Sequence, residues 1–198
     1  MGAGRFRVER QGKKLAELRL LVPGAHNRLN ATGVIALTAE LGIEPRLAAE
    51  ALSSFPGARR RMERLGTWRG ASLYDDYGHH PTKVRVTLAA ARELGHRRLL
   101  LVFQPHRYSR YQALRDDFAD SLRGADSVVV TEIYAAGEPN PGRLSSAELA
   151  ALVPGAHFAP DLAAAREHLE ALVEPGDLVL LMGAGDIRSL GDELAHAG

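Results

Sequence analysis

The 198-residue chain contains no cysteine, and several other common features are also missing from it. The absence of thiols excludes disulfides, thiol catalysis and metal sites built from thiolates. The sequence has no run of 18 apolar residues and no charged-then-apolar leader, so we expect no membrane span, no secretion and a cytoplasmic location. The net charge of +1 provides no global field that would favour nucleic acid or an anionic membrane.

Lysine is scarce as well. Of the 25 basic residues only Lys13, Lys14 and Lys83 are lysines, and the others are arginines. None of the three stands in a Gly-x-x-x-x-Gly-Lys-Ser/Thr loop, which cradles nucleotide phosphates with its backbone and its lysine. The sequence therefore lacks a phosphate-binding loop of this type.

Short apolar runs alternate with helical patterns from about residue 63 onward. Strands are expected at 62–68, 71–74, 98–103, 127–131, near 157 and at 178–182, and helices at 81–94, 111–122, 145–152, 161–173 and from 187. This alternation predicts an α/β fold with a doubly wound, mostly parallel, Rossmann-like sheet. Residues 1–62 offer a hairpin and two helices at 26–41 and 45–53, which amounts to a partial α/β segment. We therefore divide the chain into residues 1–62 and 63–198.

Two polar motifs directly follow apolar runs of the predicted sheet. The first is Asp75-Asp76-Tyr77-Gly78-His79-His80-Pro81-Thr82, and the second is Gln104-Pro105-His106-Arg107-Tyr108-Ser109-Arg110. Ligands of open α/β sheets bind beyond the carboxyl ends of the strands. Carboxylates, histidines and arginines gathered there are costly to bury without a ligand. The two motifs therefore predict a site for an anionic substrate and a nucleotide.

Three further groups allow both a structural and a functional interpretation. His26-Asn27-x-x-Asn30 begins a helix, so Asn27 fits a helix cap, whereas His26 and Asn30 suit a metal and an adenine edge. Arg59-Arg60-Arg61 is either a solvated basic run or a phosphate clamp between the two parts of the chain. Gly183-Ala184-Gly185-Asp186-Ile187 fits a tight strand-to-helix turn as well as it fits contact with a ligand.

Taken in order, these residues resemble the Mur ligase family along essentially the whole chain. The matching segments are Gly24 to Asn30, Gly57 to Glu63, Asp75 to Thr82, Phe103 to Arg110, Tyr134 to Glu138 and Gly183 to Ile187. The resemblance implies ATP-driven amide formation, in which L-alanine is joined to UDP-N-acetylmuramate through an acyl phosphate. It also implies that residues 1–62 are the tail of the central ATP-binding domain and residues 63–198 the C-terminal domain. The UDP-binding domain and the rest of the central domain would then be partners that lie outside this chain.

The resemblance also implies roles for particular residues, with ATP and Mg as cofactors. His26 would touch the magnesium–phosphate region, and Asn30 the adenine. Arg60 or Arg61 would meet the phosphates in a catalytic role. On the ATP and acyl-phosphate side the resemblance places Asp76, Tyr77 and the catalytic His79. The residues that would bind the muramate or the alanine carboxylate are His80, His106, Arg107 and Arg110.

The sequence departs from the family pattern at three positions. Met62 replaces an aromatic residue, Lys83 a glutamate and Tyr111 a threonine. Lys83 reverses a charge beside the expected site. The alternatives that stay open are a stand-alone ligand-binding module, one half of a split ligase, and a sister ligase that recycles muramyl tripeptide. The Gln-Pro-His-Arg-Tyr-Ser-Arg motif favours alanine addition over recycling.

We expect the purified chain to release no phosphate from Mg-ATP beyond the buffer rate, because the lysine-bearing loop that orients the phosphates is absent from its sequence. A coupled phosphate-release assay measures this directly. Steady turnover that rises in proportion to the concentration of the chain would contradict the expectation.

Overall fold

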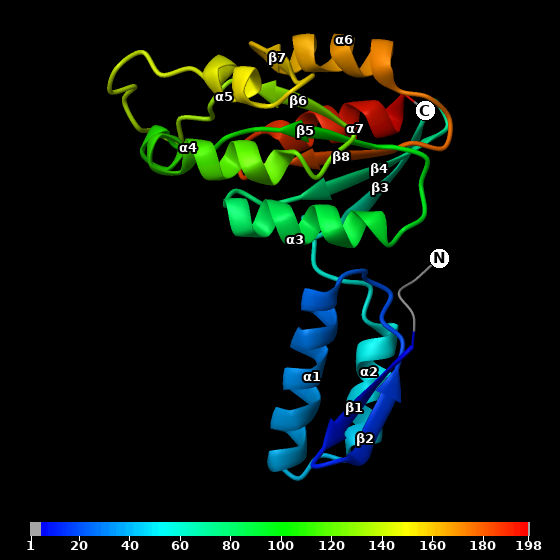
Figure 1. The fold of residues 1–198 in the computed structure, drawn as a ribbon. Helices are drawn as coiled ribbons and strands as arrows, with labels where there is room; N and C mark the ends of the chain where they lie inside the picture. Colours follow the sequence, from blue (N-terminus) through cyan, green and yellow to red (C-terminus); the bar gives the residue numbers. More distant parts are fainter. Residues whose placement is uncertain (1–4, 198) are drawn as a thin grey trace. The chain divides into compact units, whose positions relative to one another are not determined.

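A computed structural model describes residues 5–197 of the chain. Two compact units are present (Figure 1). The N-terminal unit contains the chain up to Ala58 together with Ala89–Gly95, and the C-terminal unit contains Arg59–Leu88 and the chain from His96 onward. Arg59 to Met62 belong to the C-terminal unit, whereas the sequence-based division assigned them to the first segment. In the described part of the chain, no helix combines the length and the apolar character needed to cross a membrane.

A hairpin and two helices build the N-terminal unit. Strands β1 (Phe6–Arg10) and β2 (Lys13–Leu18) pair antiparallel. Helices α1 (Ala25–Glu40) and α2 (Pro45–Ser54) follow, and α2 begins with proline at a first-turn position. Gln11 and Gly12 join the strands with φ values of 51° and 77°, which is the left-handed pair that a two-residue turn requires. The hairpin and the two helices were predicted, and the structure confirms them.

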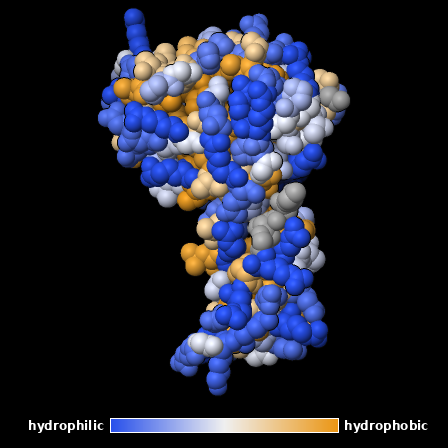
Figure 2. Space-filling view, turned by 45° about the vertical axis from the view of Figure 1, so that its right-hand side comes forward, coloured by the Kyte–Doolittle hydropathy of each residue, from blue (hydrophilic) through white to orange (hydrophobic). Residues whose placement is uncertain are grey.

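The small core of this unit lies between the hairpin and the helices. It consists of Val8, Ala16, Leu18, Leu20, Ala31, Ile35, Ala48 and Ala49. Helix α1 is also apolar on a second face, because Leu29 and Leu37 are 72% and 63% exposed, and Leu41 directly after the helix is 71% exposed. Hydrophobic residues reach the molecular surface among the charged ones (Figure 2). The hairpin and α2 therefore cover only part of the apolar surface of α1.

The C-terminal unit is built on a six-stranded sheet with the strand order β3-β4-β8-β5-β6-β7. The strands are β3 (Glu63–Trp68), β4 (Ala71–Asp76), β5 (Leu99–Phe103), β6 (Ser127–Thr131), β7 (His157–Ala159) and β8 (Leu178–Met182). Only the β3–β4 pair is antiparallel. The predicted α/β class and mostly parallel sheet are confirmed.

Helices lie on both faces of this sheet (Figure 1). They are α3 (Pro81–Arg92), α4 (Tyr108–Leu122), α5 (Ala147–Leu152), α6 (Leu162–Leu172) and α7 (Ile187–His196). Leu100 and Val102 of β5 pack in one cluster with residues of α6 and α7, and the alternate residue Phe103 meets Phe118 of α4 with ring centres 5.2 Å apart. Successive side chains of a strand point to opposite faces, so apolar residues in continuous runs identify a sheet that is covered on both sides.

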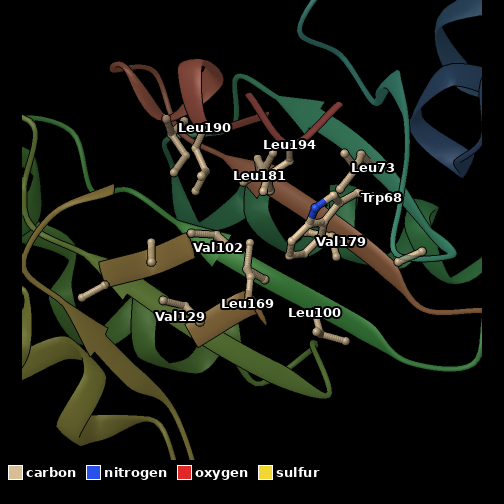
Figure 3. Packing of buried hydrophobic residues seen from close by; sticks show 14 residues of the cluster. Trp68, Leu73, Leu100, Val102, Val129, Leu169, Val179, Leu181, Leu190 and Leu194 are labelled. Carbon is tan, nitrogen blue, oxygen red and sulfur yellow. The ribbon is translucent and has the colours of Figure 1, made fainter. Parts of the chain in front are cut away.

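One face of the sheet carries an extended apolar core. Figure 3 shows Leu73, Val102, Val179 and Leu181 of the strands with Leu169, Leu190 and Leu194 of the helices. Trp68 at the end of β3 closes the cluster and is 3% exposed. Burial of such side chains contributes about 1.5–3 kcal/mol each. This core holds rigid the strands whose carboxyl ends carry the polar motifs.

The structure corrects the end of one predicted strand. The run expected at 71–74 continues through Asp75 and Asp76, which pair with Leu181 and Met182 of β8. Both carboxylates therefore belong to the sheet and are buried, at 0% and 4% exposure. The sequence pattern missed this because charged residues at a strand end read as the start of a loop.

We expect Leu181→Ala to lower the free energy of unfolding of the C-terminal unit by about 2–5 kcal/mol, because the truncation leaves a cavity in a packed core. Fluorescence of Trp68 in a urea titration reports on this unit, since Trp68 is the single tryptophan and lies in the same cluster. Leu152→Ala, at a side chain that is 41% exposed, serves as the control and should cost less than about 1 kcal/mol. Equal losses in the two variants would show that the core is not packed as described.

Candidate functional site

The ends of three adjacent strands, β4, β8 and β5, place three polar segments side by side. Tyr77 to His80 follow β4, Gly183 to Asp186 follow β8, and Gln104 to Arg110 follow β5. Two of these segments are the motifs of the sequence. All three segments belong to the C-terminal unit.

Asp76 fixes the turn that follows β4. One carboxylate oxygen accepts the backbone N–H of Met62 at 2.9 Å, and the other accepts that of Gly78 at 2.8 Å. Burial raises the pKa of Asp76, and the two backbone hydrogen bonds oppose that rise. Both carboxylate oxygens therefore accept hydrogen bonds from the backbone, and Asp76 stabilises the loop that carries Tyr77 and His79.

Asp75 is the centre of a buried ionic network. Its carboxylate lies 3.4 Å from Nε of Arg60 and 3.1 Å from a guanidinium nitrogen of Arg188. Arg188 also contacts Glu63 at 2.7 Å. Burial raises the pKa of Asp75 although the two arginines oppose it, whereas the hydrogen bond from Arg188 lowers the pKa of Glu63. The network ties β3, β4 and α7 together beneath the site.

Arg188 was not singled out in the sequence analysis. Its sequence signal is weak, because an arginine near a helix start with Asp192 four residues later is typical of an ordinary surface ion pair, and that pair exists at 2.8 Å. Only the tertiary structure adds Asp75 and Glu63 to its partners. Arg188 is therefore a structural support of the site that the sequence pattern concealed.

The arginine triplet divides into different roles. Arg60 donates to the carbonyl oxygens of Gly183 at 2.9 Å and Gly185 at 3.4 Å, and its guanidinium lies 4.7 Å from the Tyr77 ring centre. Arg61 is exposed and lies 5.7 Å from the same ring. The Arg60 side chain is thus engaged with the protein, while Arg61 is the better placed of the two to meet a phosphate group.

Four rings form a row that joins the two motifs. Tyr77 and His79 meet edge to face at 5.2 Å, His79 and His106 lie 6.0 Å apart, and His106 stacks on Tyr134 at 5.6 Å with 17° between the planes. Both motifs were expected at strand ends of the predicted sheet, and the structure brings them into contact through His79 and His106. Tyr134 completes the row from the loop after β6.

The segment from Tyr134 to Glu138 forms hydrogen bonds with the second motif, Gln104 to Arg110. Arg107 N–H donates to the Tyr134 carbonyl, and Tyr134 N–H donates to the Pro105 carbonyl, both at 2.8 Å. Glu138 accepts from the backbone N–H of Ser109 at 3.0 Å and from its hydroxyl at 2.7 Å. This segment was part of the family resemblance but had no assigned role. It holds the start of α4 and the His106 ring in place.

Both histidines of the ring row are surrounded by cationic side chains. Burial lowers the pKa of His79 and of His106, and the positive charge of Arg110 lowers both further. The hydrogen bond with the Tyr77 carbonyl opposes the shift at His79. Both imidazoles are therefore neutral at pH 7, since even an unperturbed histidine has a pKa of about 6.5.

Arg107 and Arg110 lie at the start of α4. Arg107 is exposed and adopts a φ of 70°. A guanidinium nitrogen of Arg110 lies 3.3 Å from Nδ1 of His106 and donates to the backbone carbonyl oxygen of His106 at 3.2 Å. His80 is exposed, and its Nδ1 accepts the N–H of Thr82 at 3.3 Å. A helix start flanked by two guanidinium groups suits a carboxylate or phosphate.

His26 and Asn30 lie on α1 of the N-terminal unit and do not belong to the ring row. The helix begins after Gly24, without a capping side chain. Asn27 donates to the Pro23 carbonyl at 2.7 Å. The interpretation of Asn27 as the helix cap is therefore wrong, because the preceding Pro23-Gly24 turn already occupies the capping position.

The glycines after β8 are required by close packing within the protein. A Cβ atom on Gly183 would lie 2.9 Å from the Gln104 carbonyl oxygen, and one on Gly185 would lie 2.4 Å from Gln104 Oε1 and from Tyr134 Cγ. Gln104 in turn donates to Asp186 at 2.6 Å and accepts the Ile187 N–H at 3.2 Å. Of the two interpretations left open by the sequence, the tight strand-to-helix turn accounts for these glycines.

Comparison with protein families matches residues 60–185 to "Mur ligase, glutamate ligase domain". A relative from Gloeobacter violaceus, named UDP-N-acetylmuramate–L-alanine ligase, is 47% identical over an alignment of 192 residues, and the match covers 95% of this chain and 42% of the relative. A relative of the same name from Acidothermus cellulolyticus is 47% identical over 190 residues, covering 93% and 40%. The chain thus spans about two fifths of the length of these relatives.

Solved structures agree with this similarity. The UDP-N-acetylmuramate–alanine ligase of Thermotoga maritima is 34% identical with a TM-score of 0.78, and the match covers 98% of this chain and 42% of that one. A murein peptide ligase from Psychrobacter arcticus is 25% identical with a TM-score of 0.64, and the match covers 99% and 42%.

We expect Gly185→Ala to destabilise the C-terminal unit by about 1–3 kcal/mol, because the added methyl group would overlap Gln104 and Tyr134. Urea unfolding followed by Trp68 fluorescence measures the change. Gly142→Ala is the matched control, since nothing lies within 4 Å of a Cβ at that position. A Gly185→Ala variant as stable as the control would mean that the loop after β8 is not packed against Gln104.

Proposed function

The chain belongs to the Mur ligase family, and on this premise we propose that it provides the amino-acid-binding portion of an ATP-dependent ligase that joins L-alanine to UDP-N-acetylmuramate. Such a ligase would act in peptidoglycan precursor synthesis in the cytoplasm. The relatives at 47% identity carry that name, which supports this choice of substrates. The chemistry is amide formation, which needs an activated carboxylate and an uncharged amine.

The observation that carries the proposal is the set of cationic side chains around the ring row. Three guanidinium groups, those of Arg61, Arg107 and Arg110, border neutral imidazoles that follow β4 and β5, the two strands on either side of β8. Guanidinium groups bind carboxylates and phosphates through paired hydrogen bonds. In the proposed reaction Arg107 and Arg110 hold the carboxylate of L-alanine, and Arg61 faces the phosphate side. Positioning of two anionic reactants supplies much of the rate enhancement in such a reaction.

The proposed ATP contacts follow from the family resemblance. Tyr77 and Arg61, with His79 beside them, lie in the C-terminal unit, and Asn30 and His26 are proposed contacts from the N-terminal unit. Asp76 acts indirectly in this scheme, because its oxygens hold the loop of Tyr77. We also propose that residues 1–62 form the tail of a central ATP-binding domain, with the rest of a ligase of this family as the partner.

The described residues do not by themselves form a magnesium site. No group of three or more His, Asp or Glu side chains within residues 5–197 is arranged to hold a metal ion. Magnesium also prefers oxygen ligands, which makes the imidazole of His26 an unsuitable ligand by itself. We therefore assign no step of the reaction to a metal held by this chain.

Arg107→Ala should weaken the binding of L-alanine by about ten- to a hundredfold, since loss of one charge-assisted hydrogen bond costs about 1.5–3 kcal/mol. Isothermal titration of the purified chain at neutral pH measures the affinity. Arg166→Ala serves as the control, because Arg166 pairs with Glu170 on α6, away from the ring row. Failure of the unmodified chain to bind L-alanine, or equal binding by the Arg107 variant, would refute the assigned role of this surface.

A further inference from the structure

The hydrogen bond of His79 determines which ring nitrogen carries its proton. Its Nδ1 lies 2.8 Å from the carbonyl oxygen of Tyr77. A carbonyl oxygen only accepts hydrogen bonds, so Nδ1 must be the protonated nitrogen that donates. In the neutral ring the proton is then absent from Nε2, which keeps its lone pair.

His106 is held in the opposite state. Its Nδ1 lies 3.3 Å from a guanidinium nitrogen of Arg110. A guanidinium group has five N–H donors and no acceptor, so Nδ1 of His106 must be the acceptor. In the neutral ring the proton therefore resides on Nε2. Stacking on Tyr134 at 17° between the planes holds this ring in its orientation.

The second nitrogen of each ring is left available for a ligand. Within residues 5–197, Nε2 of His79 and Nε2 of His106 make no hydrogen bond. The two rings are 6.0 Å apart, so one small molecule can reach both. The pair therefore offers one lone pair and one N–H donor at neighbouring positions.

We propose that His79 and His106 are fixed in opposite neutral tautomers, and that Nε2 of His79 accepts the proton of the incoming amino group. The inference rests on the proposed function and adds the proton acceptor of that reaction. His106, through its Nε2–H, donates to an anionic oxygen of the same substrate.

The charged side chains that face His79 and His106 show that His79 is suited to accept a proton and not to bind an anion. Arg110, Arg61 and Lys83 face His79, and Arg107, Arg110 and Glu138 face His106. An imidazolium at position 79 is disfavoured among these cations, so His79 is not a further positive group for phosphate. The same cations repel an ammonium group, which therefore requires a lone-pair acceptor to remain in the site. Nε2 of His79 is such an acceptor.

The proton balance of the step is complete. The ammonium group transfers one proton to Nε2 of His79, and the freed nitrogen lone pair forms the C–N bond to the acyl phosphate carbon. The C–O bond to phosphate then breaks, and its electron pair leaves with the phosphate oxygen. The departing phosphate takes the second proton from the nitrogen, which leaves the neutral amide. The imidazolium returns its proton to water, because burial and the surrounding cations lower the pKa of His79.

The tautomers are tested by ¹⁵N NMR of the histidine rings in the labelled full chain at pH 7.5. We expect protonation at Nδ1 for His79 and at Nε2 for His106, with His79→Asn and His106→Asn identifying the signals. His196 is an internal reference, since its Nδ1 also meets a backbone carbonyl, that of Asp192. A proton on Nε2 of His79 would overturn the inference.

The role in binding is tested by comparing L-alanine with propionate, which lacks the amino group. His79→Asn preserves an N–H near the Tyr77 carbonyl but removes the distal acceptor. We expect the preference of the chain for L-alanine over propionate to fall by about tenfold or more in this variant, consistent with the loss of a hydrogen bond to a charged group. His196→Asn should leave the preference unchanged.

The pH dependence supplies a second readout. Protonated His79 has no lone pair at Nε2, so L-alanine affinity should be full above the lowered pKa and fall by about tenfold per pH unit below it. In His79→Asn this decline should disappear. If His79→Asn kept both the preference for L-alanine over propionate and the loss of affinity at low pH, the inference would be overturned and the proposed function would stand. If the unmodified chain bound neither L-alanine nor propionate, the proposed function would be overturned together with the inference.

Discussion

The burial of two adjacent carboxylates at the end of β4 is the constraint on which the candidate site depends. Asp75 and Asp76 are almost inaccessible to water, so each must be neutralised or hydrogen-bonded. One carboxylate oxygen of Asp75 is paired with Arg60 and Arg188, and Asp76 accepts two backbone N–H groups through its two oxygens. Because these partners come from the start of β3, the loop after β4 and the start of α7, satisfying the carboxylates also positions those segments. Loss of either carboxylate would release several elements at once.

The same arrangement determines how charge is distributed over the site. Arg60 and Arg188 are engaged with buried acids, whereas Arg61 and Arg107 remain exposed. Burial and the cations around His79 and His106 lower the pKa of both rings and keep them uncharged at neutral pH, and the hydrogen bonds to Tyr77 and Arg110 select their tautomers. A site with positive walls and neutral rings is suited to anionic groups and to an amine that must lose a proton. The chemistry follows from partners of the histidines more than from the histidines themselves.

Much of the fold could be predicted from the sequence because its signals are local. Continuous apolar runs such as 99–103 and 178–182 identify strands that are covered on both faces, and the glycine and proline punctuation marks their ends. The two polar motifs stood out because charged residues follow these runs directly. The parts that escaped prediction are non-local. Arg188 resembles a surface residue until Asp75 and Glu63 are placed beside it, and Tyr134 acquires its role only by stacking on His106.

By itself the sequence determined the fold class, the order of the elements and the set of side chains available at the strand ends, since these depend on periodicity and composition within short windows. It also determined the family resemblance, which depends on the order of the motifs. Only the tertiary structure decided that β4 continues through Asp76, that Arg60 binds the protein while Arg61 faces outward, and that Gly185 is required by Gln104 and Tyr134. The physical reason is that burial, hydrogen-bond partners and proton positions arise from contacts between residues that are distant in the chain.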